Sequence, residues 1–159
     1  MNMVSHRIRS AFLALFFMLA LPAFAQSVVK FDKEPLVIET TAGQKYNFTV
    51  EIADTNEQRQ RGLMYRQDMA ADAGMIFDFG TSKRVQMWME NTVLPLDMLF
   101  VDRAGIVRGV KQNAVPYSRD IIDSVSPVKY VIELNAGAAA KLGLKAGDRV
   151  TSPTITKYK

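Results

Sequence analysis

The chain contains no cysteine, and its single histidine, His6, lies close to the N-terminus. A domain without cysteine forms no disulfide and takes its stability from a hydrophobic core. If His6 is removed with a leader segment, the remaining chain has neither His nor Cys. These absences exclude Ser-His-Asp and Cys-His catalysis and the ordinary zinc sites. Carboxylate, Lys or Tyr chemistry, cation binding by oxygen and thioether ligation of a soft metal remain open.

Clusters of like charge, internal repeats and low-complexity tracts are also missing. The chain has 20 basic and 16 acidic residues, and loss of Arg7 and Arg9 with a leader would leave 18 and 16, a net charge of +2. A nucleic-acid-binding surface needs Lys and Arg clustered on one face or arm. We therefore expect no nucleic-acid partner.

Only one long apolar run is present, and it lies at the N-terminus. The basic residues Arg7 and Arg9 precede the run from Ala11 to Leu21, and Ala23-Phe24-Ala25 follows as a small-x-small cleavage site. We predict that residues 1–25 are a signal peptide cleaved after Ala25 and that residues 26–159 form one domain. An uncleaved anchor is the alternative, although the run is shorter than the roughly 20 residues that span a membrane. The expected product is periplasmic or secreted, without a stable membrane span.

The rest of the chain shows mostly strand patterns. Leu36–Glu39 and Tyr46–Ile52 predict a hairpin around Thr41–Gln44, with one buried face. Thr55 and Gln58 have capping-box spacing and predict a short surface helix over residues 56–61, which Gly62 can end in a left-handed C-cap. Further strands are expected at 74–79, 96–101, 106–110, 129–134 and from 149, with turns at 80–82 and 102–105 and a short helix at 138–142. We predict a mainly β (α+β) fold, a compact single-domain antiparallel sheet or barrel-like fold with two or three short helices.

The segment from Arg84 to Val101 contains the only Trp and joins two apolar stretches through a polar connection with Pro95. Val85, Met87 and Met89 alternate with Gln86, Trp88 and Glu90, which places Trp88 on the polar face. Asp97 begins a strand that is apolar on both faces. Because a buried carboxylate needs partners, we expect Asp97 to be buried and to accept hydrogen bonds from backbone amides or from Arg61 or Arg84. Asn91 is expected to be partly exposed.

These polar groups define a candidate binding groove near Trp88 and Asn91. The predicted binding residues are Arg61, Trp88, Glu90, Asn91, Thr92 and Asp97. Three alternatives remain open: Asp97 and Asn91 only tie down the Pro95 loop, Trp88 fills the core, or paired carboxylates among Asp78, Glu90 and Asp97 catalyse hydrolysis. The methionines suit Cu(I) as well as core packing, and they are Met64, Met75, Met87, Met89 and Met98.

Several separated blocks carry a family resemblance. They are Arg61–Met64, Gly74–Phe77, Trp88–Thr92 with Pro95–Asp97, and Tyr130–Leu134 continuing through Gly137 to Gly147–Asp148. Together they resemble the bacterial and archaeal domain-of-unknown-function family numbered 192, over about residues 36 to 150. The resemblance implies a compact, mostly antiparallel β domain with short helices, often exported, and implies no activity. Residues 139–150 are also similar to the helix-turn-strand of PDZ domains, but a Gly-Leu-Gly-Phe-type carboxylate loop is missing upstream.

These observations favour an exported soluble domain that serves as a periplasmic binding or accessory module. Its partner would be an unidentified small ligand or protein, held near Trp88 and Asn91. The alternative is a small carboxylate-based hydrolase acting on an envelope polymer. The length of the chain and the lack of a nucleophile motif favour the binding module over an enzyme. We expect no cofactor and no structural metal.

Overall fold

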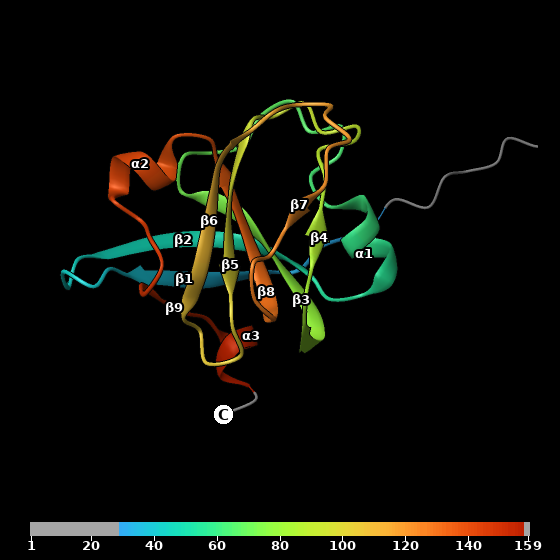
Figure 1. Ribbon diagram of the computed structural model, residues 1–159. Helices are drawn as coiled ribbons and strands as arrows, with labels where there is room; N and C mark the ends of the chain where they lie inside the picture. The colour runs from blue at the N-terminus through green and yellow to red at the C-terminus, as the bar shows by residue number, and fades with distance from the viewer. Residues whose placement is uncertain (1–28, 158–159) are drawn as a thin grey trace, which may run out of the picture.

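The computed structural model describes residues 29–157, and the predicted signal peptide lies outside this range. Nine strands and three short helices follow one another along the described chain (Figure 1). In order they are β1 Lys33–Glu39, β2 Lys45–Ala53, α1 Asn56–Arg61, β3 Ala73–Lys83, β4 Gln86–Met87, β5 Leu96–Val101, β6 Val107–Ala114, β7 Ile122–Asp123, β8 Val128–Asn135, α2 Ala138–Leu142, β9 Arg149–Thr151 and α3 Pro153–Thr156.

Seven strands form one curled sheet in the order β6-β5-β8-β3-β2-β1-β9, and β4 pairs with β7 in a small second sheet. The mainly β, barrel-like prediction is confirmed. The pairing is antiparallel throughout the large sheet except between β2 and β3, which run parallel. This one parallel pair is consistent with a mostly antiparallel domain, and it arises because α1 and the following loop return the chain to the end of the sheet at which β2 began.

The two edges of the sheet meet where Gly105 approaches β9. A bridge joins Ile106 to Arg149, and the Val150 amide donates to the Gly105 carbonyl at 2.7 Å. Gly105 has a φ of 81°, and a Cβ there would lie 2.4 Å from the Val150 carbonyl oxygen. Only glycine therefore allows the sheet to close in this way.

Hydrophobic side chains lie on both faces of the central strands. The core inside the curl includes Ile132 and Leu134 of β8, while Met75, Met98 and Val131 belong to a second core on the outer face. Every residue of β5 is buried, which confirms the prediction of a central strand. Met87 of β4 belongs to the outer core, and Ile122 of β7 packs against it.

Most local predictions are confirmed, with three differences. Thr55 and Gln58 form the capping box of α1, and α1 has no buried residue. Gly62 ends α1 with φ 44° and ψ −137°, which is not the left-handed helical C-cap that was expected. The chain stays in β3 through Lys83 instead of turning at 80–82, with an irregular register between Asp78 and Lys83. Strand β7 and helix α3 were not predicted, because neither has more than four residues.

Candidate ligand pocket

A pocket opens on the outer face of the sheet, between α1 and the β4 segment. Its volume is ≈ 170 Å³, which suits a ring-sized group, since an engineered apolar cavity of about 150 Å³ holds benzene. Six of its 14 lining residues have aromatic or apolar side chains, and seven have polar or charged ones. The lining residues that matter for its chemistry are Arg59, Arg61, Phe77, Phe79, Trp88, Thr92 and Glu133.

Trp88 reaches this pocket because the chain alternates on either side of β4. Met87 and Met89 turn inward and are buried, whereas Trp88 is 43% exposed. Pairing of β4 with β7, supported by a hydrogen bond of 3.0 Å from Gln86 Nε2 to Asp123 Oδ1, holds the segment in register. The prediction that Trp88 shares the polar face is therefore confirmed, and Trp88 does not fill the core.

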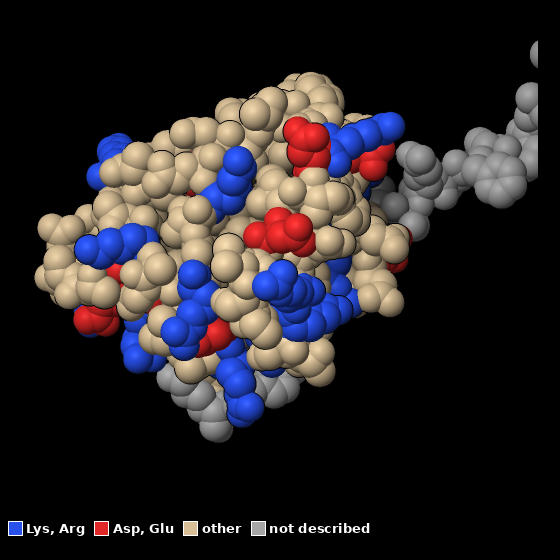
Figure 2. Space-filling view, viewed as in Figure 1, with Lys and Arg blue, Asp and Glu red and all other residues tan. Residues whose placement is uncertain are grey.

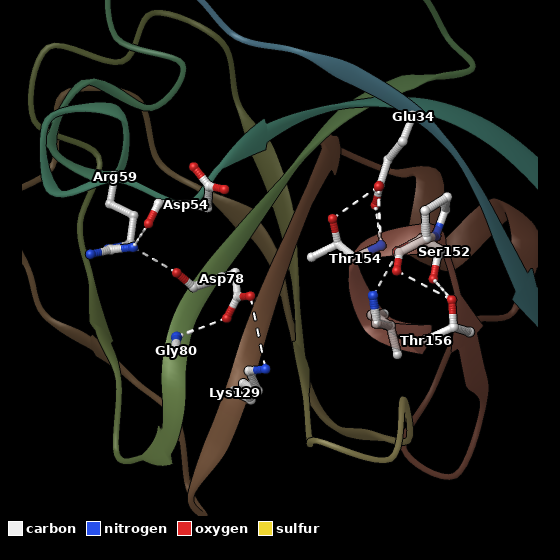
Figure 3. Close-up of polar contacts among 11 residues, drawn as sticks. Glu34, Asp54, Arg59, Asp78, Gly80, Lys129, Ser152, Thr154 and Thr156 are labelled. Atoms are coloured by element: carbon white, nitrogen blue, oxygen red, sulfur yellow. Dashed lines mark hydrogen bonds and ion pairs between the residues drawn. The ribbon is translucent and has the colours of Figure 1, made fainter. Parts of the chain in front are cut away.

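Helix α1 supplies two cations with different surroundings. Arg59 donates to the carbonyl oxygens of Asp54 and Asp78 (Figure 3). Its Nη2 also donates to Asn56 Oδ1. Its guanidinium also lies 5.9 Å from the Phe79 ring centroid. Arg59 is therefore occupied in joining α1 to β3. Arg61 is exposed and contacts the Tyr65 ring at 4.7 Å, so its N–H groups remain available at the mouth of the pocket.

Glu133 lies at the inner end of the pocket. It is directly opposite Met75 of β3 and Met98 of β5, so the three side chains share the outer face of the sheet. The residue is only 4% exposed, and no hydrogen bond or ion pair joins its carboxyl group to another residue within 29–157. Burial raises the pKa of Glu133 to about 8. The carboxyl group is thus held mainly in its neutral form at pH 7.

Sequence reasoning missed Glu133, although the signal was present. The run Tyr130–Leu134 was interpreted as an ordinary strand, yet it places one carboxylate inside an otherwise apolar segment. The same argument had singled out Asp97 in β5. The difference between the two residues is that Asp97 has partners and Glu133 has none among the described residues.

Asp97 is fully buried, as predicted, and it stabilises the fold from the inner face of the sheet. Its carboxylate accepts hydrogen bonds of 2.8 Å from the backbone amides of Asn113 and Ala139. Ala139 lies in the first turn of α2, whose N-cap, Gly137, has no side chain to accept that bond. The backbone partners were expected, whereas Arg61 and Arg84 do not contact Asp97. Asp97 pairs with Leu134, which belongs to the inner core, so it does not line the pocket.

The remaining predicted site residues occupy the loop that follows β4. Thr92 is buried and lines the pocket. Asn91 is half-buried, and its Nδ2 lies 4.0 Å from the Met64 sulfur. Glu90 is partly exposed and pairs with Arg119 at 2.8 Å. The structure therefore brings Arg61, Trp88 and Thr92 together at the pocket, while Glu90, Asn91 and Asp97 lie outside its wall.

Residues with a strained backbone conformation are concentrated beside the pocket. Among the described residues, four that are not glycine have positive φ, namely Tyr65, Asn91, Asn113 and Tyr117. The Tyr65 amide donates to the Asn91 carbonyl at 2.9 Å, and the Tyr117 amide donates to the Thr92 carbonyl at 3.1 Å. Three of the four are therefore tied into one loop cluster, in which Tyr65 and Tyr117 are exposed. Strain of this kind persists where surrounding contacts hold it, and it is concentrated at functional sites.

Sequence comparison places these features in a family. The profile of the DUF192 family, described as an uncharacterized ACR, matches residues 37–152.

The chain belongs to the DUF192 family.

Two solved structures resemble this DUF192 domain. One, from Sinorhizobium meliloti 1021, is described as a candidate transcription regulator. Its sequence is 50% identical to this chain and its TM-score is 0.77, and the match covers 79% of this chain and 97% of that chain. The other, a protein of unknown function from Novosphingobium aromaticivorans, is 38% identical with a TM-score of 0.71, over 74% of this chain and 83% of that one. No functionally curated protein matches the chain.

The DUF192 domain does not bring the three candidate catalytic carboxylates together. Asp78 accepts from the Gly80 amide at 2.8 Å and lies 3.9 Å from Lys129 Nζ (Figure 3). Asp78 and Asp97 are opposite Tyr130 and Leu134 of β8, four residues or about 13 Å apart along the strand. Paired glycosidase carboxyls lie about 5 to 9.5 Å apart, and Glu90 lies in a surface ion pair instead.

Of the five methionines considered as copper ligands, four serve as core residues, whereas Met64 is half-buried and lines the pocket. Met75, Met87, Met89 and Met98 are all buried in the outer core. Within residues 29–157, no group of three or more His, Cys, Asp and Glu side chains is placed to hold a metal ion. In the same range, no helix is long and apolar enough to cross a membrane.

Proposed function

We propose that this DUF192 domain is an exported binding module that holds a small ligand, free or as part of a partner, in the pocket between α1 and β4. One observation carries the proposal: an aromatic-lined pocket ends at a buried carboxyl group, that of Glu133, which has no partner among the described residues. Burying a polar group without a hydrogen-bond partner lowers the stability of the folded protein by about 1 kcal/mol to several kcal/mol. Such a cost is retained mainly where function requires it.

The surroundings of the pocket support a binding surface. Trp88 is an exposed aromatic in its wall, and Tyr65 and Tyr117 are exposed on the strained loops beside it. Aromatic residues that combine an apolar body with a polar tip are enriched at binding surfaces. Export is proposed from the signal-peptide pattern of residues 1–25, which lie outside the described range.

Binding is favoured over catalysis because Glu133 is the only carboxyl group among the residues that line the pocket. A reaction by paired carboxylates would need a second one opposite it. We do not propose for this chain a regulatory role of the kind described for the S. meliloti protein. The described helices have six, five and four residues, too short to read a DNA groove as recognition helices do. Acidic residues also lie among the basic ones on the face shown in Figure 2.

The only Trp of the chain makes the proposal directly testable. A set of small polar and aromatic fragments is screened by Trp88 fluorescence, and amide chemical shifts then locate each binder. The expected shifts are confined to α1, residues 86–92 and the neighbourhood of Glu133. Trp88→Ala should weaken binding severalfold as measured by NMR, whereas Val125→Ala, which removes an exposed apolar side chain outside the pocket wall, should not. Failure of every fragment to bind, or shifts located elsewhere, would refute the proposal.

A further inference from the structure

We infer that the ligand of this pocket is a small zwitterion, with an ammonium group that pairs with Glu133 and an anionic group that pairs with Arg61. This inference rests on the proposed function and names the chemical class of the ligand. It follows from three features of the pocket: the group at its inner end, the charge at its mouth and its size.

The inner end of the pocket favours an ammonium group. Glu133 is 4% exposed and has no partner within the described chain, so an incoming donor would meet an acceptor that nothing else occupies. The rings of Phe77, Phe79 and Trp88 line the same pocket. Aromatic rings attract cations, and aromatic walls are a recurrent means of holding ammonium groups. A carboxylate bounded by such walls is suited to an ammonium ion, which has three N–H donors or several polarised methyl groups.

The mouth of the pocket favours an anion on the same molecule. Arg59 and Arg61 are the charged residues that line the pocket together with Glu133. Arg59 is occupied by the carbonyl oxygens of Asp54 and Asp78. Arg61 is exposed, and its guanidinium contacts the Tyr65 ring but forms no ion pair or hydrogen bond with another described residue. A simple monocation would be repelled by these guanidinium groups, whereas a zwitterion could place its anionic group against Arg61, because a guanidinium binds carboxylates in bidentate geometry.

The size of the pocket limits what lies between the two charges. A volume of ≈ 170 Å³ admits one ring-sized or branched apolar group, and it is below the roughly 300 Å³ at which pockets for drug-sized ligands begin. Amino acids with a modest apolar side chain, and betaines, have this combination of size and charge. The buried position of Glu133 and the exposed position of Arg61 orient the ammonium group inward and the anion outward.

Matched probes test the inference. L-leucine and glycine betaine are titrated against the domain while Trp88 fluorescence is recorded, beside isopentylamine and 4-methylpentanoic acid, which each keep one charge of leucine. At least one zwitterion should bind more tightly than either single-charge analogue. Loss of a charge-assisted contact lowers affinity by roughly tenfold or more, so Glu133→Gln and Arg61→Gln should each show such a loss. Lys45→Gln, which removes an exposed cation on β2 outside the pocket, should leave affinity unchanged.

The dependence of affinity on pH separates two roles of Glu133. A carboxylate that pairs with ammonium must be ionised, and burial raises the pKa of Glu133 to about 8. The ionised fraction therefore grows roughly fiftyfold between pH 6 and pH 8, and affinity for the zwitterion should grow with it. Affinity that falls over this range would show instead that neutral Glu133 donates to the ligand, and it would overturn the inference.

Two further results would overturn it. One is the absence of any response to either zwitterion at about 10 mM, far above the concentration at which specific small ligands bind. The other is binding of isopentylamine or 4-methylpentanoic acid as tightly as the zwitterions. If other fragments still occupy the pocket, only the ligand class is wrong and the binding function stands. If no compound of any kind binds at Trp88, both fail.

Discussion

Replacing Glu133 with glutamine should stabilise the domain, and the gain should increase as the pH rises. The pKa of Glu133 is raised by burial from 4.5 to about 8. Below pH 4.5 the group is protonated in both the folded and the unfolded chain, so its titration adds no cost to folding there. As the pH rises toward 8, the unfolded chain releases the proton while the folded chain retains it. The unfolded state is thereby favoured, and the stability of the native protein falls through this window.

The size of the effect follows from that pKa difference. One pKa unit corresponds to about 1.4 kcal/mol of free energy. The pKa of Glu133 is 4.5 in the unfolded chain and about 8 in the folded chain. Proton linkage between these states makes the free energy of unfolding lower at pH 8 than at pH 5 by about 3 kcal/mol. Glutamine has nearly the same shape and no proton to release, so Glu133→Gln removes this loss. It still leaves an amide to be buried in the pocket.

Urea unfolding of both proteins at pH 5, 6, 7 and 8 measures the difference. Subtracting the two curves removes the contributions of all other titrating groups, which both proteins share. Glu39→Gln is the matched control, because Glu39 is a carboxyl group at the end of β1 with 42% side-chain exposure and a Lys45 partner. Its difference from the native protein should vary much less over this range than that of Glu133→Gln.

A difference curve for Glu133→Gln that is flat from pH 5 to pH 8 would refute the reasoning. Such a result would mean that the Glu133 carboxylate is ionised in the folded protein at low pH, and thus that it has a partner or ready access to water. The same result would remove the observation on which the proposed pocket function rests. A stability gain of Glu133→Gln over the native protein that grows with pH would be the strongest evidence that the domain retains a destabilising carboxyl group.

Three further predictions concern the frame, the leader and metal dependence. Asp97→Ala leaves the amides of Asn113 and Ala139 without an acceptor, so it should lower the free energy of unfolding by at least about 2 kcal/mol. Asn91→Ala should lower the free energy of unfolding by about 1 kcal/mol or less. Urea unfolding measures both variants, and the reverse order of the two effects would refute this division of roles. The intact mass of periplasmic protein should begin at Gln26, and a membrane-bound form that retains Met1 would contradict cleavage. Thermal unfolding should coincide with and without chelator, and a large drop in Tm with chelator would reveal a bound cation.

Local patterns in the sequence determined much of the frame. The first hairpin follows from alternation around Gly43, and the start of α1 from the spacing of Thr55 and Gln58, because both depend on residues that are neighbours in the chain. The burial of Asp97 followed from the apolar residues on either side of it. The position of Trp88 on the polar face followed from the two-residue period of an extended chain.

Arg61, Trp88 and Thr92 of the pocket were predicted from the sequence, but only the tertiary structure showed that Glu133 lies at its inner end. The two-residue period shows that Glu133 and Leu134 face opposite sides of β8, but it does not show what covers each side. That depends on α1 and the β4 segment, which lie more than 40 residues earlier in the chain and form the pocket over the outer face. The parallel pairing of β2 with β3 and the closure at Gly105 also depend on contacts between distant segments. Two carboxyl groups in similar apolar strands thus have different roles. Asp97 stabilises the fold because it accepts hydrogen bonds from two backbone amides on the inner face, whereas Glu133 lines a pocket on the outer face.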